Sequence, residues 1–356
     1  QSFHGRESMN REQLLEFLKE YDGPACTLME VCGTHTASIV NNGIPSLLSD
    51  RIHLISGPGC PVCVTVTSYI DRLVELSLEK DTTVFAFGDL LRVCGSDVSL
   101  AGARAIGGSV RMVYSPMEIL DIAEQNPGTR CVFAAVGFET TTPVYVLLIK
   151  EALRRGLTNV QLLTSLKTMP EVIRWLCRKS EGKRITGFLA PGHVCAVTGL
   201  SEYRELAEEF QLPFVVSGFE GEELLASIYG LVREQGHGIA RNFYPEVVRE
   251  DGNPKAREAV DEIFCTADAA WRGMSVIPGS GKLLRPEYRR FDAGSAGLTE
   301  DHVANGCCCP QILTGDLTPC DCPLFGKVCT PSSPHGSCMV SQEGSCYNYY
   351  VGGMRK

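Results

Sequence analysis

Two cysteines separated by two residues lie in a glycine- and proline-rich turn at residues 56–63 (SGPGCPVC). An apolar run at 52–55 precedes the turn and an amphipathic segment follows it, so the sequence predicts a strand, a tight turn and a helix. A Cys-x-x-Cys pair at such a turn is a recognised redox arrangement, and a following helix dipole favours the thiolate form of Cys63. We interpret Cys60 and Cys63 as a redox-active pair. The alternative is two packed, inert cysteines.

A second pair, Cys32 and His35, follows another apolar run, 26–31. A thiol three residues before an imidazole can be a nucleophile with its base, or two ligands of one metal. A turn cysteine beside a capping histidine is the structural alternative. The position at a predicted strand end, like that of the first pair, favours a functional role.

Eight of the 17 cysteines lie between Cys307 and Cys346. Four of them are spread over a short stretch with glycine and proline, which suits an iron–sulfur cluster or a Cys₄ zinc site: Cys322, Cys329, Cys338 and Cys346. Because the paired Cys-x-x-Cys knuckles of most structural zinc sites are missing, we favour a [4Fe–4S] cluster. The other four could form a disulfide, relay electrons or be incidental neighbours: Cys307, Cys308, Cys309 and Cys320.

Two weaker motifs follow later strands. Glu139 stands in Gly137–Thr141, where a carboxylate could position a histidine or a substrate, although the threonines could equally cap a helix. His193 stands in Pro191–Cys195, and a single histidine in a turn is more often a hydrogen-bonding residue than a ligand.

The elements that position these residues alternate between strand and helix. Strands are predicted at 26–31, 52–55, 84–87, 110–114, 131–136, 160–163, 185–190 and 214–216. Helices are predicted at 9–20, 66–79, 116–125, 142–155, 170–179, 201–210 and 221–235. This alternation predicts an α/β protein whose parallel sheets are covered by helices.

The order of the elements predicts four parts. An N-terminal helix (1–23) precedes two similar α/β domains, 24–125 and 126–240, and a C-terminal part, 241–356, follows. In that last part 254–271 is predicted to be helical, 278–297 is rich in glycine and proline, and the cysteine-rich end needs metal to become ordered. Ligands bind at the carboxyl ends of parallel strands, so two sheets that face each other would bring six residues to one cleft: Cys32, His35, Cys60, Cys63, Glu139 and His193.

Composition excludes several classes of function. The 356 residues are 44% hydrophobic and 21% charged, as in ordinary soluble globular proteins. A net charge of −9 argues against general nucleic-acid binding. We find no apolar run long enough for a membrane, no signal-peptide pattern, and neither phosphate-loop nor dinucleotide fingerprint. We therefore expect a cytoplasmic protein, in which clustered cysteines serve metal or redox chemistry.

Together, the motifs resemble those of the HypD family of hydrogenase maturation factors. The matching segments follow the family order over nearly the whole chain: Met29–Thr36, Gly57–Thr65, Gly137–Thr141, Pro191–Val194 and Asp321–Cys346. Two positions depart from the family pattern. Cys195 replaces a small hydroxyl residue, and Val66 replaces a common proline.

The resemblance implies assembly of the Fe(CN)₂CO unit of [NiFe]-hydrogenases. Members of the family work with the chaperone HypC to hold one iron while cyanide and carbonyl are attached, and HypE delivers the cyanide. The resemblance makes Cys32, helped by His35, the iron site, and Cys60 and Cys63 the redox pair. It assigns the [4Fe–4S] cluster to Cys322, Cys329, Cys338 and Cys346.

We expect electrons to pass from the cluster through the dithiol to the iron, since thiolates suit a low-spin Fe(II) carrying cyanide and carbonyl. The sequence leaves open whether the protein catalyses the assembly or serves as its scaffold. One rival interpretation is an iron–sulfur thiol–disulfide reductase acting on a protein, which has no use for Cys32 and His35. A second is a structural zinc protein that serves as an interaction platform.

Overall fold

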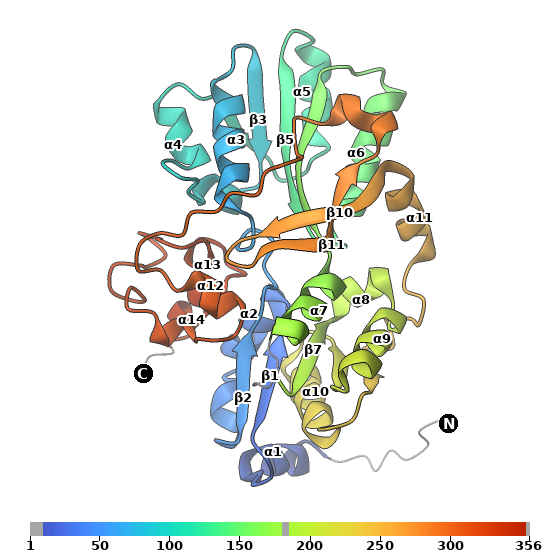
Figure 1. Cartoon of the computed structure of the whole chain (residues 1–356), viewed down its shortest axis with the longest axis vertical. Coiled ribbons are helices and arrows are strands. Elements are labelled where there is room, and N and C mark those ends of the chain that lie inside the picture. Colours follow the sequence, from blue (N-terminus) through green and yellow to red (C-terminus); the bar gives the residue numbers. More distant parts are fainter. Residues whose placement is uncertain (1–9, 180–184, 354–356) are drawn as a thin grey trace.

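The computed structural model of the chain describes residues 10–179 and 185–353, so the first nine residues of the predicted 1–23 segment lie outside it. Within these ranges the strands form two sheets, each covered by helices on both faces, at opposite ends of an elongated molecule (Figure 1). The predicted α/β class, the parallel sheets and the cysteine-rich C-terminal region are confirmed.

The first sheet, sheet A, is entirely parallel, with the strand order β2-β1-β7-β8-β9. Its strands are β1 (Cys26–Glu30), β2 (Ile52–Ser56), β7 (Gly187–Pro191), β8 (Phe214–Ser217) and β9 (Ala240–Asn242). Side chains alternate between its faces, since Leu189 joins the core under α1 and α10 whereas Phe188 and Ala190 join the core under α7 and α9. Both faces are therefore buried, as the apolar runs predict.

The second sheet, sheet B, has the order β10-β11-β6-β5-β3-β4. Its parallel strands are β3 (Thr82–Ala86), β4 (Val110–Met112), β5 (Arg130–Gly137) and β6 (Val160–Lys167), and an antiparallel hairpin adds β10 (Phe264–Trp271) and β11 (Ser275–Leu284). Along the central strand β5, Val132 and Ala134 face the core that contains α3, and Phe133 faces the core that contains α6. The hairpin lies between the two halves of the molecule (Figure 1).

The α-helices are α1 (Arg11–Glu20), α2 (Gly33–Asn41), α3 (Thr67–Leu78), α4 (Leu100–Ala105), α5 (Glu118–Gln125), α6 (Thr142–Arg154), α7 (Met169–Lys179), α8 (Gly192–Thr198), α9 (Ser201–Phe210), α10 (Gly221–Arg233), α11 (Pro254–Ile263), α12 (Cys309–Leu313), α13 (Ser337–Val340) and α14 (Ser345–Val351). Local sequence signals determine where several of these helices begin. Asn10 and Gln13 form a capping box on α1, and Asn253 caps α11 with Pro254 in its first turn. Among the described residues, no helix is both long and apolar enough to cross a membrane.

The division of strands between the sheets differs from the predicted ranges 24–125 and 126–240. The chain leaves sheet A after β2, builds β3 to β6 of sheet B, returns to sheet A for β7 to β9, and then adds the hairpin to sheet B. Each sheet therefore takes strands from both ranges. The chain can return to a sheet that it has left, because a crossover connection between parallel strands can be long. The pattern of strands along the sequence therefore does not show which sheet each strand joins.

One helix of the C-terminal prediction needs correction. The predicted helix at 254–271 ends at Ile263, and residues 264–271 form β10, whose alternating burial is that of a strand. The glycine- and proline-rich passage, 278–297, begins within β11. Beyond it the chain forms only short helices, and α14 packs against α2 of sheet A. This cysteine-rich tail lies beside the junction of the two sheets (Figure 1).

Candidate metal and redox centre

Strand ends from both sheets meet the tail at a pocket of about 160 Å³. The segments after β1 and β2 contribute Cys32 and Gly59, the turn after β5 contributes Thr140 and Thr141, and α8 contributes His193. The tail closes the pocket with Glu343. Three of the predicted motifs, with parts of the Cys60/Cys63 turn, therefore share one site, as the rule for parallel strand ends predicts.

Cys32 is the residue that precedes α2, so its thiol lies at the N-terminus of that helix. The pKa of this thiol is raised to about 12, chiefly by burial and to a smaller extent by the carboxylates of Glu30 and Glu343, against the opposing effect of the backbone N–H groups of His35 and Thr34. Cys32 is therefore a protonated thiol in the metal-free protein. A bound cation would replace the proton, since thiolate is the form that ligates metals.

Glu30, at the end of β1, organises the segment around Cys32. One carboxylate oxygen accepts the N–H of Cys32 at 2.9 Å, and the other accepts the hydroxyl of Thr36. The side chain is buried, which raises the pKa of Glu30 to about 7. Sequence reasoning missed this residue; the available signal was an acidic residue at the end of an otherwise apolar strand.

His35 is fully buried and does not line the pocket. Its Nε2 lies 2.9 Å from the carbonyl oxygen of Gly218 and so carries a proton, whereas Nδ1 has no hydrogen-bond partner among the described residues. Burial lowers the pKa of His35 to about 4, so the ring is neutral near pH 7. A neutral imidazole with one unprotonated nitrogen is the form that binds metal ions.

His193 is the histidine that faces the pocket. Its ring stacks on Phe219, with 3.9 Å between the ring centroids, and His35 contacts the same phenyl ring at 4.8 Å. Partial burial lowers the pKa of His193. Phe219 thus packs against both histidines predicted from the sequence, and only His193 reaches the pocket beside Cys32.

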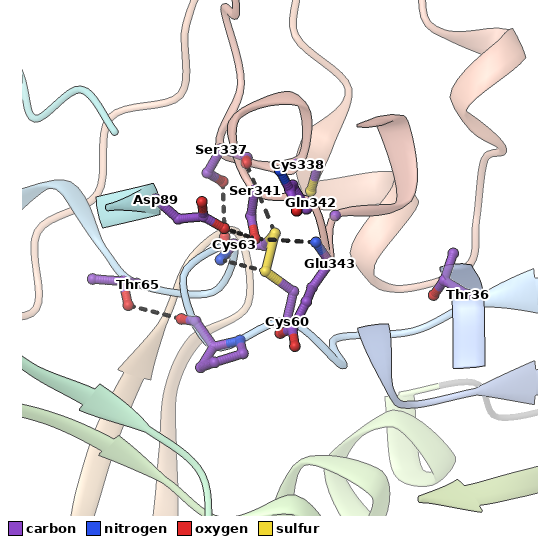
Figure 2. Close-up of a disulfide and its surroundings, with 12 residues drawn as sticks. Thr36, Cys60, Cys63, Thr65, Asp89, Ser337, Cys338, Ser341, Gln342 and Glu343 are labelled. Carbon is purple, nitrogen blue, oxygen red and sulfur yellow. Dashed lines mark hydrogen bonds between the residues drawn. A yellow bond between two sulfur atoms is a disulfide. The ribbon is translucent and has the colours of Figure 1, made fainter. Parts of the chain in front are cut away.

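Cys60 and Cys63 are joined by a buried disulfide. Helix α3 begins at Thr67, so Cys63 precedes the helix and does not form its first turn. The tail lies directly against the disulfide: the hydroxyl of Ser337 donates to the carbonyl of Cys63 at 2.9 Å, and the Cys63 sulfur lies 3.8 Å from the Ser337 carbonyl oxygen (Figure 2). This contact links the predicted redox pair to the cysteine-rich tail.

The four predicted cluster cysteines are buried and belong to one packed core: Cys322, Cys329, Cys338 and Cys346. The thiol of Cys338 interacts with that of Cys346, and its Sγ lies 2.7 Å from Sγ of Cys309. Cys309 interacts in turn with Cys307, and Cys308 interacts with Cys322. Three cysteines that the sequence left without a role therefore lie among the predicted ligands.

The donor set agrees with a thiolate-bound cluster. Soft sulfur donors predominate. The contact with Cys346 and burial raise the pKa of the Cys338 thiol, and the contact with Cys338 and burial raise that of Cys309. Binding of a cation by the thiolates would replace these protons. In the part of the chain that the structure describes, no three His, Cys, Asp or Glu side chains are grouped as ligands of one metal ion. The thiols there pack on one another instead.

Glu139 is not in the Cys32 pocket. Its carboxylate accepts the N–H of Met169 at 2.7 Å and lines a larger cavity of about 440 Å³ on the other side of the same turn. Burial raises the pKa of Glu139 to about 7. Of the six residues expected to share one cleft, only Cys32 and His193 line the Cys32 pocket among the residues that the structure describes. His35, Cys60 and Cys63 do not line it. Glu139 lines the other cavity, because successive residues of the turn point to different cavities.

Glu139→Gln is expected to change how stability depends on pH. In the folded protein the pKa is raised, so the stabilising contribution is complete below the unfolded pKa of 4.5 and is lost as pH rises through about 7. Relative to the variant, the wild type should lose up to about 3 kcal/mol of unfolding free energy over this range. Urea unfolding across the range measures the difference. If the unfolding free energies of the wild type and the variant change with pH in the same way, the raised pKa of Glu139 is contradicted. Glu246→Gln, at an exposed glutamate, is the control.

Comparison with known proteins places this site in context. A family model described as "HypD: Hydrogenase formation hypA family" matches residues 10–352. The chain is 40% identical over 341 residues to hydrogenase maturation factor HypD of Rhodobacter capsulatus, covering 92% of this chain and 90% of that protein. It is 40% identical over 332 residues to hydrogenase maturation factor HypD of Escherichia coli K12, with 91% and 88% covered. A putative hydrogenase expression/formation protein of Methanocaldococcus jannaschii is 37% identical over 328 residues, with 91% of each chain covered.

Proposed function

Because this chain belongs to the HypD family of hydrogenase maturation factors, we propose that it holds one iron ion while cyanide and carbonyl ligands are attached to it, producing Fe(CN)₂CO. The observation that supports this most is the position of Cys32. Its thiol faces a pocket to which both sheets and the tail contribute, beside the turn that carries the Cys60–Cys63 disulfide. The iron is the cargo of this site.

Each side chain has a proposed role. Cys32 binds the iron as a thiolate, and the proton that the thiol loses leaves on binding. Glu30 fixes the Cys32 backbone through the 2.9 Å hydrogen bond. Of the two histidines, His193 faces the pocket, whereas His35 offers only Nδ1 because Nε2 is bound to Gly218. The small pocket leaves Cys32 accessible to a HypC-type chaperone, whose cysteine would complete the iron site.

The Cys60/Cys63 pair can supply the electrons that the proposed reaction consumes. Release of cyanide from a thiocyanate carried by a HypE-type partner breaks the sulfur–carbon bond and consumes two electrons. A reduced Cys60/Cys63 pair supplies both electrons, forms the disulfide seen here and releases two protons, one of which the partner's thiolate can take. Cys322, Cys329, Cys338 and Cys346 would hold a [4Fe–4S] cluster, which would supply single electrons for re-reduction. We propose that the protein acts in the cytoplasm, where such thiols stay reduced.

The test is anaerobic co-purification with the HypC-type chaperone, followed by infrared spectroscopy of the cyanide and carbonyl stretching region. Wild type should show both kinds of band, and Cys32→Ala should lose them completely, since the variant removes the iron-binding thiolate. Cys131→Ala is the control for loss of a cysteine, because Cys131 is buried in β5, away from the pocket.

The rival function is a thiol–disulfide reductase, which the observed disulfide also favours. In that case wild type would show no cyanide or carbonyl bands, and reduction of protein disulfides would survive Cys32→Ala. If the cyanide and carbonyl bands persist in Cys32→Ala, a residue other than Cys32 binds the iron.

A further inference from the structure

A separate cavity of about 310 Å³ lies where the tail meets the loop after β3 and the β10–β11 hairpin. It shares no lining residue with the Cys32 pocket. Among the described residues that line it, four have basic side chains and none is an aspartate or a glutamate. The four are Arg92, Arg272, His302 and His335. A cavity lined by charged groups of one sign concentrates ions of the opposite charge.

Arg272 is the central feature of this cavity. It is only 7% exposed, and its Nε donates to the carbonyl of Thr65 at 2.7 Å. Its Nη2 is buried and has no hydrogen-bond partner among the described residues. A buried guanidinium donor without an acceptor is costly, so the arrangement calls for an acceptor from outside the described chain.

The nearest carboxylate does not fill this need. Asp301 Oδ1 lies 3.7 Å from Nε of Arg272, beyond hydrogen-bond distance. The two oxygens of Asp301 accept the backbone N–H groups of Thr67 and Gly273 instead, at 3.2 and 2.9 Å. Asp301 thus balances part of the charge of Arg272 and leaves its terminal nitrogen unpaired.

We propose that this cavity is a binding site for a small oxoanion, a phosphate, sulfate or compact carboxylate group, held by the guanidinium groups of Arg272 and Arg92. The planar fork of arginine matches two oxygens of such groups. The volume is at the lower end of that of small-molecule sites, which suits a compact anion. The side chain of Arg92 already bonds the carbonyl of Pro331, which fixes it at the rim.

The site adjoins the sulfur centre through two shared residues. Ser337 lines the cavity and donates to the carbonyl of Cys63 at 2.9 Å. Gly336 also lines it and packs so closely on the thiols that an added Cβ would lie 2.8 Å from Sγ of Cys307. A bound anion would therefore lie one residue away from both the disulfide and the cysteine cluster.

Isothermal titration of the full-length protein with inorganic phosphate, against sodium chloride of equal ionic strength, tests the proposal. Wild type should bind one phosphate per chain, and Arg92→Gln and Arg272→Lys should each weaken binding about ten-fold, as expected for one charged hydrogen bond. Arg289→Gln, at an exposed arginine outside the cavity, should bind like wild type.

The proposal fails if wild type shows no saturable binding of phosphate, sulfate or acetate, or if Arg92→Gln and Arg272→Lys bind as tightly as wild type. Arg272 is buried, so Arg272→Lys could fail to fold; Arg92→Gln, at the rim, then decides. Parallel titrations with sulfate and acetate identify the group, since preference for a tetrahedral anion or for a carboxylate each supports the site and names its ligand. Because none of these readouts involves iron, their failure leaves the proposed maturation function untouched.

Discussion

Replacing Gly59 by alanine is expected to disrupt the Cys32 loop and the Cys60–Cys63 turn together. The backbones of these two segments lie in direct contact: the N–H of Gly33 donates to the carbonyl of Gly59 at 3.2 Å, and a Cβ on Gly59 would lie 2.5 Å from Cα of Cys32. The atoms that the new methyl group would meet belong to the backbone, so the clash cannot be relieved by a change of side-chain rotamer. We expect a loss of about 3 kcal/mol of unfolding free energy.

Thermal and urea unfolding measure that loss, and iron retention during co-purification reports on the site itself. Gly128→Ala is the matched control, because a Cβ there meets no atom within 4 Å. Its stability should stay within about 0.5 kcal/mol of wild type. Equal stability and equal iron retention in Gly59→Ala and Gly128→Ala would show that the two segments can separate freely.

Cys63→Ala is expected to abolish cyanide transfer completely and to leave the visible absorbance of the iron–sulfur cluster intact. The substitution removes one member of the dithiol, so the remaining thiol cannot deliver an electron pair by forming an internal disulfide. The hydrogen bonds between Cys63 and the tail run to Ser337, through its carbonyl and its hydroxyl, and not to a cluster cysteine.

The measurement pairs visible absorbance with infrared detection of iron-bound cyanide, using anaerobically purified protein and the partner proteins. Cys131→Ala again serves as the control for removal of a buried thiol. Loss of the cluster in Cys63→Ala would overturn the separation of roles between the dithiol and the tail cysteines. Unchanged cyanide transfer would remove the dithiol from the proposed function.

The strands and most helices could be predicted because each is a local pattern. The apolar runs that form β1, β5 and β8 are buried on both faces, and short polar or cysteine-bearing turns end them. The convergence of Cys32, Gly59 and His193 followed from one rule about parallel strand ends.

The failures share a dependence on tertiary context. Residues 264–271 contain three alanines in eight positions, and alanine favours helix, but pairing with β11 overrides this preference. Glu139 follows β5 as expected, yet the direction of its side chain depends on the packing of Met169 against the turn. The contact of Cys309 with Cys338 joins residues 29 positions apart in a segment without periodic structure, so no local pattern predicts it.

The interleaved order of the two sheets bears on how the chain folds during its synthesis. Strands β1 and β2 leave the ribosome early, but β1 pairs next with β7, and Thr27 bonds to Thr186, 159 positions later. The β10–β11 hairpin of sheet B is likewise synthesised only after all strands of sheet A. Neither sheet can close before most of the chain exists, and pairings so distant in sequence form slowly. Nascent chains of this protein therefore expose unpaired parallel strands for much of translation, which makes them clients for chaperones that shield strand edges.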